Sequence, residues 1–416
     1  MPRRQEPRRQ EPRRGEPRRD DPRPDEPLVI YLIGVAGHPN YGDELIAAGW
    51  LRYLAQVAPT AEVWLDTPRP GQSAVLLGGI HPGLRCVDTL FHACWNAPPG
   101  GPQQTIDYGR RVVRQPGLLP REVTGVEQLS RAHLVHVIGG GYLNGIWPNQ
   151  LTLLGAAREA GERFGAHTAM TGAGLIPLVE GSDGPLGELL AGFDVVDVRD
   201  EESLSAISGR VAHATCSGDD AFLDLGTHVY EQAKESRSLL CLQSDLLEIP
   251  LEEIADFTVR TLRAWGVDQE PVTLLECLPP DDAAVRTLLE PHLPLLEFQP
   301  FSELWRSGLP AGPDQRWITT RFHPHLVAAA GGSWGVAVPI SRDYYRTKHT
   351  SLLRLGSGWA LAEDLTSPAP PQRPAERPFG GRLGEIRRAK RAVAESVTAP
   401  LRRPEPAPAP RRLWGR

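Results

Sequence analysis

The sequence of 416 residues lacks the features that define several classes of protein. It has only five cysteines and no Cys-X-X-Cys pair, which argues against a disulfide scaffold or zinc ribbon and favours buried thiols in a reducing compartment. No apolar run approaches the roughly 18 residues that a membrane span needs. The first residues also lack the apolar core of a secretory signal. These absences predict a cytoplasmic protein.

Positive charge is scarce in the body of the chain and concentrated at its two ends. The formal net charge is −6, with +2 in residues 1–27 and +8 in residues 367–416, which leaves −16 for residues 28–366. Proteins that bind nucleic acid need clustered lysine and arginine side chains against the phosphates. The acidic body therefore predicts no nucleic-acid partner.

The N-terminal end is a repeat of five residues, which reads PRRQE, PRRQE, PRRGE and then PRRDD. A proline at every fifth position blocks a continuous helix, and the repeat has almost no apolar side chain to bury. We predict that residues 1–27 form a disordered tail.

The C-terminal end, residues 367–416, is predicted to be a basic, proline-rich tail that contains one short helix within residues 380–398. Four apolar residues fall close to one face of that helix: Leu383, Ile386, Val393 and Val397. Lys390 falls with the arginines on the other faces. We interpret the segment as a solvated helix. The alternative is a weak peripheral contact with the anionic inner face of the cell membrane.

Between the tails, strands and helices alternate. The sequence predicts a first set of strands at residues 28–35, 62–65, 74–77, 134–138, 167–170 and 195–198. A second set is predicted at residues 238–242, 272–277, 317–319 and 336–340. Repeated βα units of this kind form parallel sheets with helices on both faces. Because the polar stretch 226–237 separates the two sets, we predict an α/β protein with two Rossmann-like domains, residues 28–225 and 238–366, facing a cleft.

Ligands of such sheets bind at the carboxyl ends of the strands, so the turns after the strands contain the candidate site residues. Glycine lets a ligand approach the backbone closely, and Tyr142 with Trp147 could stack on a sugar ring. Asn40 or Asp43 could equally cap the following helix. The candidate cleft or acceptor residues are Asn40, Asp43, Gly140, Gly141, Tyr142, Asn144 and Gly174.

Cationic side chains stand at three other turns. Arg199 follows the strand at 195–198, where it could form a surface ion pair or hold a carboxylate or phosphate. Arg321 and His323 alternate after the strand at 317–319, so in extended geometry they share one face as an anion clamp beside a proton donor. Lys348 is one of only three lysines in this arginine-rich chain, which indicates a need for a compact ammonium group.

Three familiar patterns are absent or misplaced. Residues 331–335, GGSWG, match the Gly-X-Ser-X-Gly elbow of serine hydrolases, but a helix is predicted before them and a strand after, which is the reverse of that elbow. His323 and His325 have no third ligand at a spacing suited to zinc, so no metal site is predicted. The absence of an Asp-X-Asp sequence weakens a metal-dependent nucleotide-sugar transferase.

Six motifs together resemble the polysaccharide pyruvyl transferase family over roughly residues 28–355. They are NYGDELI (40–46), GGGYLN (139–144), GAGLIP (172–177), VRDEES (198–203), DDAF (219–222) and RFH (321–323). The resemblance implies a glycosyltransferase-B-like fold. It also implies transfer of a pyruvyl group from phosphoenolpyruvate to a pair of sugar hydroxyls, which forms a ketal. Two stretches depart from the family: DDAF stands where Asp-Pro is common, and YYRTKH where Tyr-Asp-Pro-Lys is frequent.

The resemblance also implies roles for individual residues. Arg199 and Arg321 would hold the carboxylate and phosphate of the donor, with Lys348 as a further anion contact. His323 would be the general acid. The partners would be phosphoenolpyruvate and a saccharide acceptor of a cell-surface polysaccharide or glycolipid, carried on a lipid or free, and no cofactor would be needed.

The residues suit this chemistry. Phosphoenolpyruvate is a compact trianion, so we expect a locally cationic cleft within the acidic body. A histidine that titrates near neutrality can protonate the methylene carbon of the donor, which makes its C2 electrophilic. Two alternatives stay open: a two-domain glycosyltransferase that uses a nucleotide sugar, and a family member that binds sugars without turnover.

Overall fold

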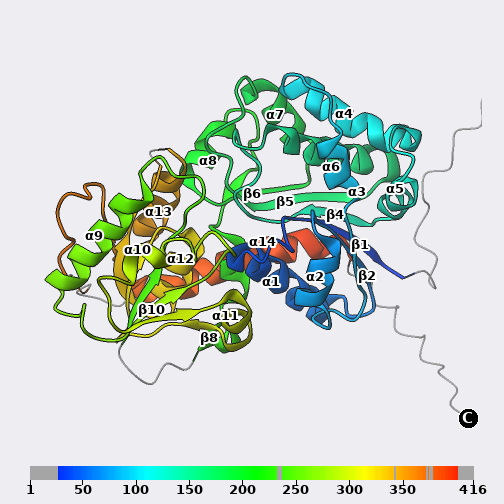
Figure 1. Ribbon diagram of the computed structural model, residues 1–416. Helices are drawn as coiled ribbons and strands as arrows, with labels where there is room; N and C mark the ends of the chain where they lie inside the picture. The colour runs from blue at the N-terminus through cyan, green and yellow to red at the C-terminus, as the bar shows by residue number, and fades with distance from the viewer. Residues whose placement is uncertain (1–26, 232–236, 342, 372, 374–377, 402–416) are drawn as a thin grey trace, which may run out of the picture.

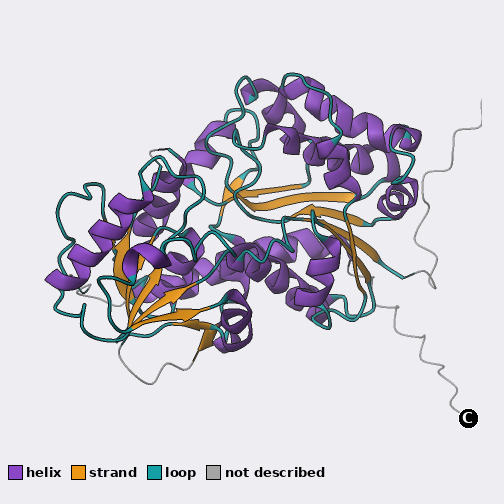
Figure 2. Ribbon diagram, in the orientation of Figure 1, coloured by secondary structure: helices purple, strands orange, loops and turns teal. Residues whose placement is uncertain are grey.

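The computed structural model describes residues 27–231, 237–341, 343–371, 373 and 378–401. The chain forms two domains, each with a parallel sheet between layers of helices (Figures 1 and 2). The repeat predicted to be disordered lies, except for Pro27, outside the described residues. No helix within the described ranges is long and apolar enough to cross a membrane.

The N-terminal sheet has seven parallel strands in the order β3-β2-β1-β4-β5-β6-β7. Its strands are β1 (Val29–Ile33), β2 (Glu62–Asp66), β3 (Leu84–Val87), β4 (Leu134–Val137), β5 (His167–Ala173), β6 (Val195–Val198) and β7 (Thr215–Cys216). Its helices are α1 (Tyr41–Val57), α2 (Pro70–Leu77), α3 (Thr89–Trp95), α4 (Pro102–Arg114), α5 (Val123–Ser130), α6 (Leu151–Phe164), α7 (Asp183–Leu190) and α8 (Glu201–Ile207). Short 3-10 helices are η1 (Pro116–Leu118), η2 (Pro148–Gln150), η3 (Asp220–Asp224) and η4 (Thr227–Val229).

The C-terminal sheet has six parallel strands in the order β11-β10-β9-β13-β14-β15. They are β9 (Ser238–Cys241), β10 (Val272–Leu275), β11 (Leu296–Gln299), β13 (Arg316–Thr319), β14 (Trp334–Ala337) and β15 (Ala360–Leu361), and a separate pair is β8 (Tyr230–Glu231) with β12 (Leu309–Pro310). The helices are α9 (Leu251–Ala264), α10 (Arg286–Leu289), α11 (Phe301–Ser307), α12 (Phe322–Ala330) and α13 (Tyr344–Leu355). The chain ends its described part with η5 (Gly380–Arg382), α14 (Leu383–Thr398) and η6 (Ala399–Leu401).

The two sheets have the same plan. The first strand of each domain, β1 or β9, lies in the interior, and the chain adds strands first on one side of it and then on the other. Every residue of β1 and β9 is buried, as expected for strands covered by helices on both faces. The strand order reverses between β1 and β4 and between β9 and β13, and such switch points are where α/β sheets bind ligands.

One predicted strand is wrong. Residues 74–77 belong to helix α2, and the edge strand β3 comes later, at Leu84–Val87. In α2 the buried residues Ser73 and Leu77 are four apart, whereas Val75 between them is 77% exposed. That spacing is helical, and the proline at the first position of the helix supports it.

The solvated interpretation of the C-terminal helix is also wrong. Helix α14 packs against η3, β5 and β6 of the N-terminal domain, and Ile386, Ala394 and Val397 are buried in the core that α1 and α12 share. Figure 1 shows α14, in red, lying beside α1. The apolar face that a membrane contact would need is therefore covered by protein. Lys390, expected on a polar face, is completely buried.

Contacts between the domains hold the two switch points face to face. Helix α1 packs against α12, and the backbone amide of Tyr41 donates to the carbonyl of Cys277, 2.8 Å away. The Tyr344 hydroxyl of α13 donates to the carbonyl of Gly141 after β4, at 2.7 Å. One hydrophobic cluster contains residues of both domains. The loops after the central strands consequently border a common cleft.

Candidate active site

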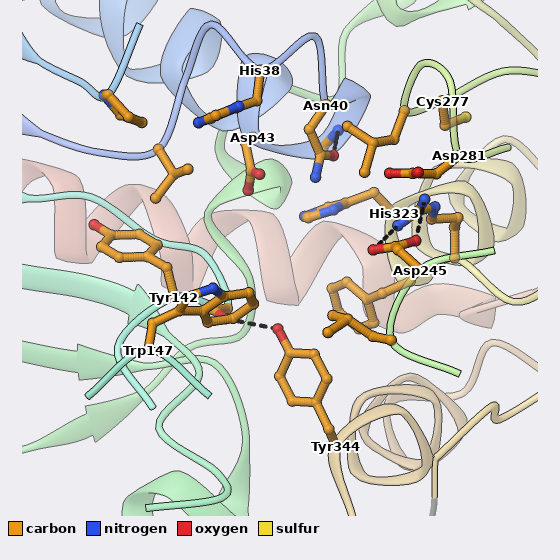
Figure 3. A pocket seen from close by; sticks show the side chains of 18 of the residues that line it. His38, Asn40, Asp43, Tyr142, Trp147, Asp245, Cys277, Asp281, His323 and Tyr344 are labelled. Atoms are coloured by element: carbon orange, nitrogen blue, oxygen red, sulfur yellow. Dashed lines mark hydrogen bonds and ion pairs between the residues drawn. The ribbon is translucent and has the colours of Figure 1, made fainter. Parts of the chain in front are cut away.

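A cleft of about 880 Å³ lies between the domains, and residues after all four strands at the switch points line it. Asp43 lies in the first turn of α1, which follows β1. Tyr142 lies in the turn after β4, Asp245 in the loop after β9, and Arg321 just after β13. Figure 3 shows Asp43, Tyr142 and Asp245 around His323. Tyr142 and Trp147 lie on the side away from Asp245 and Asp281.

His323 is fixed by the start of α12 and by the start of α1. Arg321 is the N-cap of α12, so the helix begins at Phe322 and His323 lies in its first turn. The expectation of an extended segment is therefore wrong, although both side chains still line the cleft. A Cβ atom at Gly42 would lie 1.7 Å from Nδ1 of His323, so only glycine fits at that position. The N-terminal end of α1 thus faces the imidazole, and its dipole favours negative charge there.

Asp219 contacts the other nitrogen of the imidazole. Its Oδ1 lies 3.5 Å from Nε2 of His323, and the same oxygen accepts a hydrogen bond from the amide of Ala221. Burial alone would raise the pKa of Asp219, but His323, Arg199 and that amide lower it below its ordinary value. The Asp219 carboxylate therefore contacts the imidazole on the side opposite the start of α1.

Arg199 lies at the end of β6, as expected, and it is buried against the cleft. Its Nε donates to Asp200 at 3.2 Å, and its guanidinium lies 5.0 Å from the centre of the Phe322 ring. Asp200 caps α8 by accepting from the amide of Ser203. The terminal nitrogens of Arg199 donate to no protein group in the described ranges, so the fork of the guanidinium is available to a ligand.

Arg321 is held by carboxylates of its own domain. Its Nε and Nη2 donate to Asp282 at 2.8 and 2.6 Å, and Nη2 also pairs with Asp245 at 2.7 Å. Burial disfavours its charge, but these carboxylates raise the pKa of Arg321 well above its ordinary value. Buried cations need such partners because desolvation is costly. Much of the positive charge of Arg321 is therefore already balanced.

Lys348 has the opposite environment. Its Nζ lies 3.6 Å from the centre of the Tyr344 ring and 4.8 Å from that of Tyr345, and no carboxylate of the described residues forms an ion pair with it. Burial and the nearby Arg199 lower the pKa of Lys348 well below its usual range. The carbon that an alanine would add at Gly141 would lie 3.0 Å from Nζ. The structure thus places a desolvated ammonium against the glycine turn after β4.

Asp43 and its neighbours organise the turn after β1. Asn40 is the N-cap of α1, and its Oδ1 accepts from the amide of Gly42 at 3.2 Å. Glu44 is buried and accepts from the amide of Gly37. Asp43 faces the cleft, where burial raises its pKa to about 6 although His323 and Lys348 oppose the shift. A carboxylate that titrates near 6 can accept a proton from a substrate hydroxyl.

The other candidate acceptor residues divide into two groups. Gly141 and Tyr142 line the cleft, and the Tyr142 hydroxyl is bound to the carbonyl of Ile138 at 2.7 Å. Asn144 does not line it, because its side chain holds the loop through Gly141 and Ile146.

Two glycines also lie away from the lining and have local reasons to be small. A Cβ at Gly174 would lie 2.1 Å from the guanidinium of Arg199. Gly140 has a φ of +140°, a conformation open to glycine. Asn144, Gly174 and Gly140 therefore position the site rather than form its surface.

Two rejected patterns are explained by the structure. Ser333 of the GGSWG sequence follows α12 and precedes β14, and its buried hydroxyl accepts from the amide of Gly312. His325 lies inside α12, where it contacts Ser357 and His349 and stacks on Trp359. His323 therefore lines the cleft, whereas His325 is buried against other side chains of its own domain.

Two groups of side chains among the described residues have a composition that could hold a metal ion. In one of them, Asp88 and Glu122 both contact the His92 imidazole, and Asp88 lines the cleft. In the other, Cys241, Cys277 and Asp282 place their sulfur and oxygen atoms within 4.8 Å of one another. The Asp282 carboxylate already accepts from Arg321, from the amides of Cys277 and Leu278, and from the thiol of Cys241. Its charge and lone pairs are thus satisfied by protein groups.

The cleft, which was expected to be locally cationic, contains charges of both signs. Four cationic side chains line the cleft, Arg69, Arg199, Arg321 and Lys348, and four aspartates line it as well. The aspartates are Asp43, Asp88, Asp245 and Asp281. Arg321 is paired with Asp245 and Asp282, and Arg199 with Asp200. Among the described residues, no carboxylate forms an ion pair with Lys348 or Arg69.

The arrangement is that of a two-domain protein with the glycosyltransferase-B-like fold. Solved structures with the same fold include a candidate UDP-N-acetylglucosamine 2-epimerase from Listeria monocytogenes, with 12% identity, a TM-score of 0.53 and coverage of 91% of this chain and 99% of that one. HepE from Anabaena in complex with UDP-glucose has 11% identity, a TM-score of 0.50 and coverage of 90% and 97%. The UDP-GlcNAc 2-epimerase from Neisseria meningitidis, bound to UDP-GlcNAc, has 11% identity, a TM-score of 0.50 and coverage of 89% and 100%.

The chain belongs to the polysaccharide pyruvyl transferase family. The sequence model of that family matches residues 40–278, more than half of the chain, and supports an enzyme of this type. No curated protein matches the sequence significantly. The matched range contains Asp43, Arg199 and Asp219, whereas Arg321, His323 and Lys348 lie beyond it. Their assignment therefore depends on their place in the cleft.

Sequence reasoning did not assign a role to three residues of the site: Asp219, Asp282 and Tyr344. Asp219 was part of a motif, but its distance to His323 spans two domains and has no signature in the sequence. Asp282 lies in a loop 39 residues before its partner Arg321. Tyr344 precedes Lys348 by four residues, so one turn of helix already predicts that the two share a face.

Proposed function

We propose that the protein transfers the pyruvyl group of phosphoenolpyruvate to two hydroxyls of one sugar residue. The observation that supports this most is the position of His323, between Asp219 and the start of α1, in a cleft that Arg199 and Lys348 also line. A small, trianionic enol ester requires a proton donor and cationic side chains whose N–H groups can still bind an anion.

The donor would bind between Lys348 and Arg199, with Arg321 at the far side. The Lys348 ammonium and the free fork of Arg199 would contact the phosphate and carboxylate. Binding an anion would supply the negative partner that Lys348 lacks in the described structure. Arg321 would act more weakly, because Asp282 and Asp245 already share its charge.

His323 would begin the reaction as a general acid. Its proton goes to the methylene carbon of phosphoenolpyruvate, which becomes a methyl group, while C2 becomes electrophilic. A sugar hydroxyl then attacks C2 and releases its proton to Asp43. Next the bond between C2 and the phosphate oxygen breaks, and the leaving phosphate takes the proton from Asp43. The second hydroxyl attacks the same carbon and its proton goes to His323, so both residues are restored and the products are the ketal and inorganic phosphate.

Calorimetry with phosphoenolpyruvate and UDP-glucose tests the donor. We expect phosphoenolpyruvate to bind the wild-type protein and to bind Lys348→Met at least about tenfold more weakly. The matched control is Arg346→Met, an exposed residue of the same helix whose ion partner is the exposed Glu363. Lys348→Met is a better probe than Arg321→Ala, because loss of Arg321 leaves Asp282 buried without its cation. Binding of UDP-glucose in place of phosphoenolpyruvate would refute the proposal in favour of a nucleotide-sugar transferase.

His323→Gln separates binding from chemistry. It keeps a side chain of similar size but cannot donate the proton, so we expect turnover to fall by roughly 100-fold or more. Affinity for phosphoenolpyruvate should change by less than about threefold. Release of inorganic phosphate from phosphoenolpyruvate in the presence of an acceptor sugar measures turnover. Activity that survives this change would eliminate His323 as the general acid.

A further inference from the structure

We propose that the N-terminal wall of the cleft, made by α3 and the segment 147–150, is the site that binds the acceptor sugar. This inference depends on the proposed transfer reaction and specifies where its second substrate binds. The wall comprises Asp88, Trp95, Trp147 and Gln150, all of which line the cleft. No motif of the sequence indicated Asp88, Trp95 or Gln150.

Trp95 is the first observation. It is the last residue of α3, whose Leu90, Phe91 and Cys94 are buried in the core, yet 57% of Trp95 is exposed and it borders the cleft. The ring lies 5.0 Å from that of His92, which Glu122 holds through a 2.6 Å contact with Nδ1. An indole that is supported on one side and open on the other is a suitable surface for the apolar face of a pyranose ring.

Gln150 is the second, independent observation. Its Oε1 is buried, and no described residue donates a hydrogen bond to it. A buried acceptor without a donor costs free energy unless a ligand or water completes it. A sugar hydroxyl is a donor of the right kind. The Asp88 carboxylate, which lies 3.6 Å from Nε2 of His92, is a further polar group on the same wall.

The elements of the wall are contiguous. Helix α3 packs against η2, which contains Gln150, and Trp147 immediately precedes η2. The Trp147 ring also lies 6.3 Å from that of Tyr344, beside Lys348. In Figure 3, Trp147 lies on the opposite side of His323 from Cys277 and Asp281. A sugar stacked on this wall would therefore approach a donor held at Lys348 from the side of the N-terminal domain.

The volume of the cleft leaves space for such a sugar. About 880 Å³ is near the upper end of the range for sites that hold drug-sized ligands. Phosphoenolpyruvate, a three-carbon acid with one phosphate, fills only a small part of it. The remaining space extends along the aromatic wall.

Trp95→Ala tests the proposal, with Trp95→Phe as the conservative variant. The control is Val75→Ala, which removes an apolar side chain that is 77% exposed on α2 and lies outside the cleft lining. The probes are p-nitrophenyl glycosides of galactose, glucose and N-acetylmannosamine. Saturation-transfer NMR detects their binding without turnover, and phosphate release gives separate KM values for glycoside and phosphoenolpyruvate.

We expect Trp95→Ala to weaken glycoside binding about tenfold, with the KM for phosphoenolpyruvate changed less than twofold. Trp95→Phe should restore most of the affinity, and Val75→Ala should match the wild type. Absence of saturation transfer from every glycoside, or transfer that survives Trp95→Ala, would overturn the acceptor site. Failure of phosphoenolpyruvate to bind would refute the reaction, but glycoside binding lost in Trp95→Ala would still support the wall.

Discussion

The two lysines in the described part of the chain have opposite environments. Both Lys348 and Lys390 are buried. Lys390 of α14 contacts Asp197 at 2.7 Å and Asp220 at 3.0 Å beneath the N-terminal sheet, and although burial alone would lower its pKa, these carboxylates raise it. Lys348 faces the cleft above aromatic rings, and burial lowers its pKa.

The difference distinguishes a structural charge from a functional one. The group around Lys390 is complete, because Asp220 also accepts from Trp50, Thr171 and the amide of Gly139 at the start of the glycine turn. Lys348 forms no ion pair with a carboxylate of the described residues, although Asp43 and Asp219 act on it at longer range, and it lies where the substrate is proposed to bind. A buried cation without its counter-ion is thus a better guide to a binding site than a buried cation as such.

Breaking the complete group should have the largest effect. Lys390→Met leaves Asp197 and Asp220 buried without a cation, so we expect the free energy of unfolding to fall by about 3–5 kcal/mol. Denaturant unfolding followed by circular dichroism measures the change. Arg388→Met, on an exposed face of the same helix, is the control and should change stability by less than about 0.5 kcal/mol.

If Lys390→Met does not fold, the double variant Lys390→Met with Asp220→Asn decides the question. Removing one of the two orphaned carboxylates should recover part of the lost stability. No recovery would mean that α14 is held by its apolar contacts and that the buried ions contribute little.

Loss of Lys348, unlike loss of Lys390, should not lower the free energy of unfolding. Lys348→Met removes a desolvated ammonium that has no carboxylate partner among the described residues, so we expect the free energy of unfolding to stay the same or rise by about 1 kcal/mol. Inorganic phosphate should raise the thermal midpoint of the wild-type protein and not that of the variant. Differential scanning calorimetry measures both. A large loss of stability in the absence of ligand would contradict the comparison.

Asp43 should give an effect that depends on pH. Its pKa rises from 3.8 to about 6 in the folded protein, so the folded state holds its proton more tightly than the unfolded one. The resulting stabilisation is present below pH 3.8 and is lost as the pH rises through about 6. At pH 8, Asp43→Asn should therefore be more stable than the wild type by about 3 kcal/mol, and the difference should vanish near pH 4.

Turnover of the same variant tests the proposed base. The wild-type rate should increase with pH along a limb centred near 6, where Asp43 loses its proton, and Asp43→Asn should lack both the limb and most of the activity. Stopped assays of phosphate release between pH 4.5 and 8 would show it. An unchanged limb in the variant would assign the titration to another group.

The sequence predicted the fold well because parallel strands carry a strong local signal. Buried strands such as β1 and β9 are continuous apolar runs, and glycine turns follow β4 and β5. The apolar run of β9, which follows the polar stretch 226–237, also indicated where the second domain begins. The mistakes occurred where periodicity is short or ambiguous: α2 has eight residues, and its pattern over residues 74–77 suits a strand as well as a helix.

The site was predicted only in part. Arg199, Arg321, His323 and Lys348 were all found in one cleft, since the carboxyl ends of parallel strands meet at one edge. The sequence did not predict which of these charges are balanced by ion pairs, because the carboxylates that pair with Arg321 come from two other loops. Asn144 and Gly174 looked like surface residues of the cleft, but hydrogen bonds and packing behind it determine their roles.

The sequence by itself determined the two βα domains, the order of the turns and the residue types available at each turn. These depend on local periodicity and on backbone preferences that act over a few residues. Only the tertiary structure decided that α14 returns to the N-terminal domain, that Lys390 is neutralised while Lys348 is not, and that Trp95 borders the cleft. Burial and ion pairing depend on groups far apart in the chain, such as Lys390 and Asp197, which are separated by 193 residues and which no local pattern encodes.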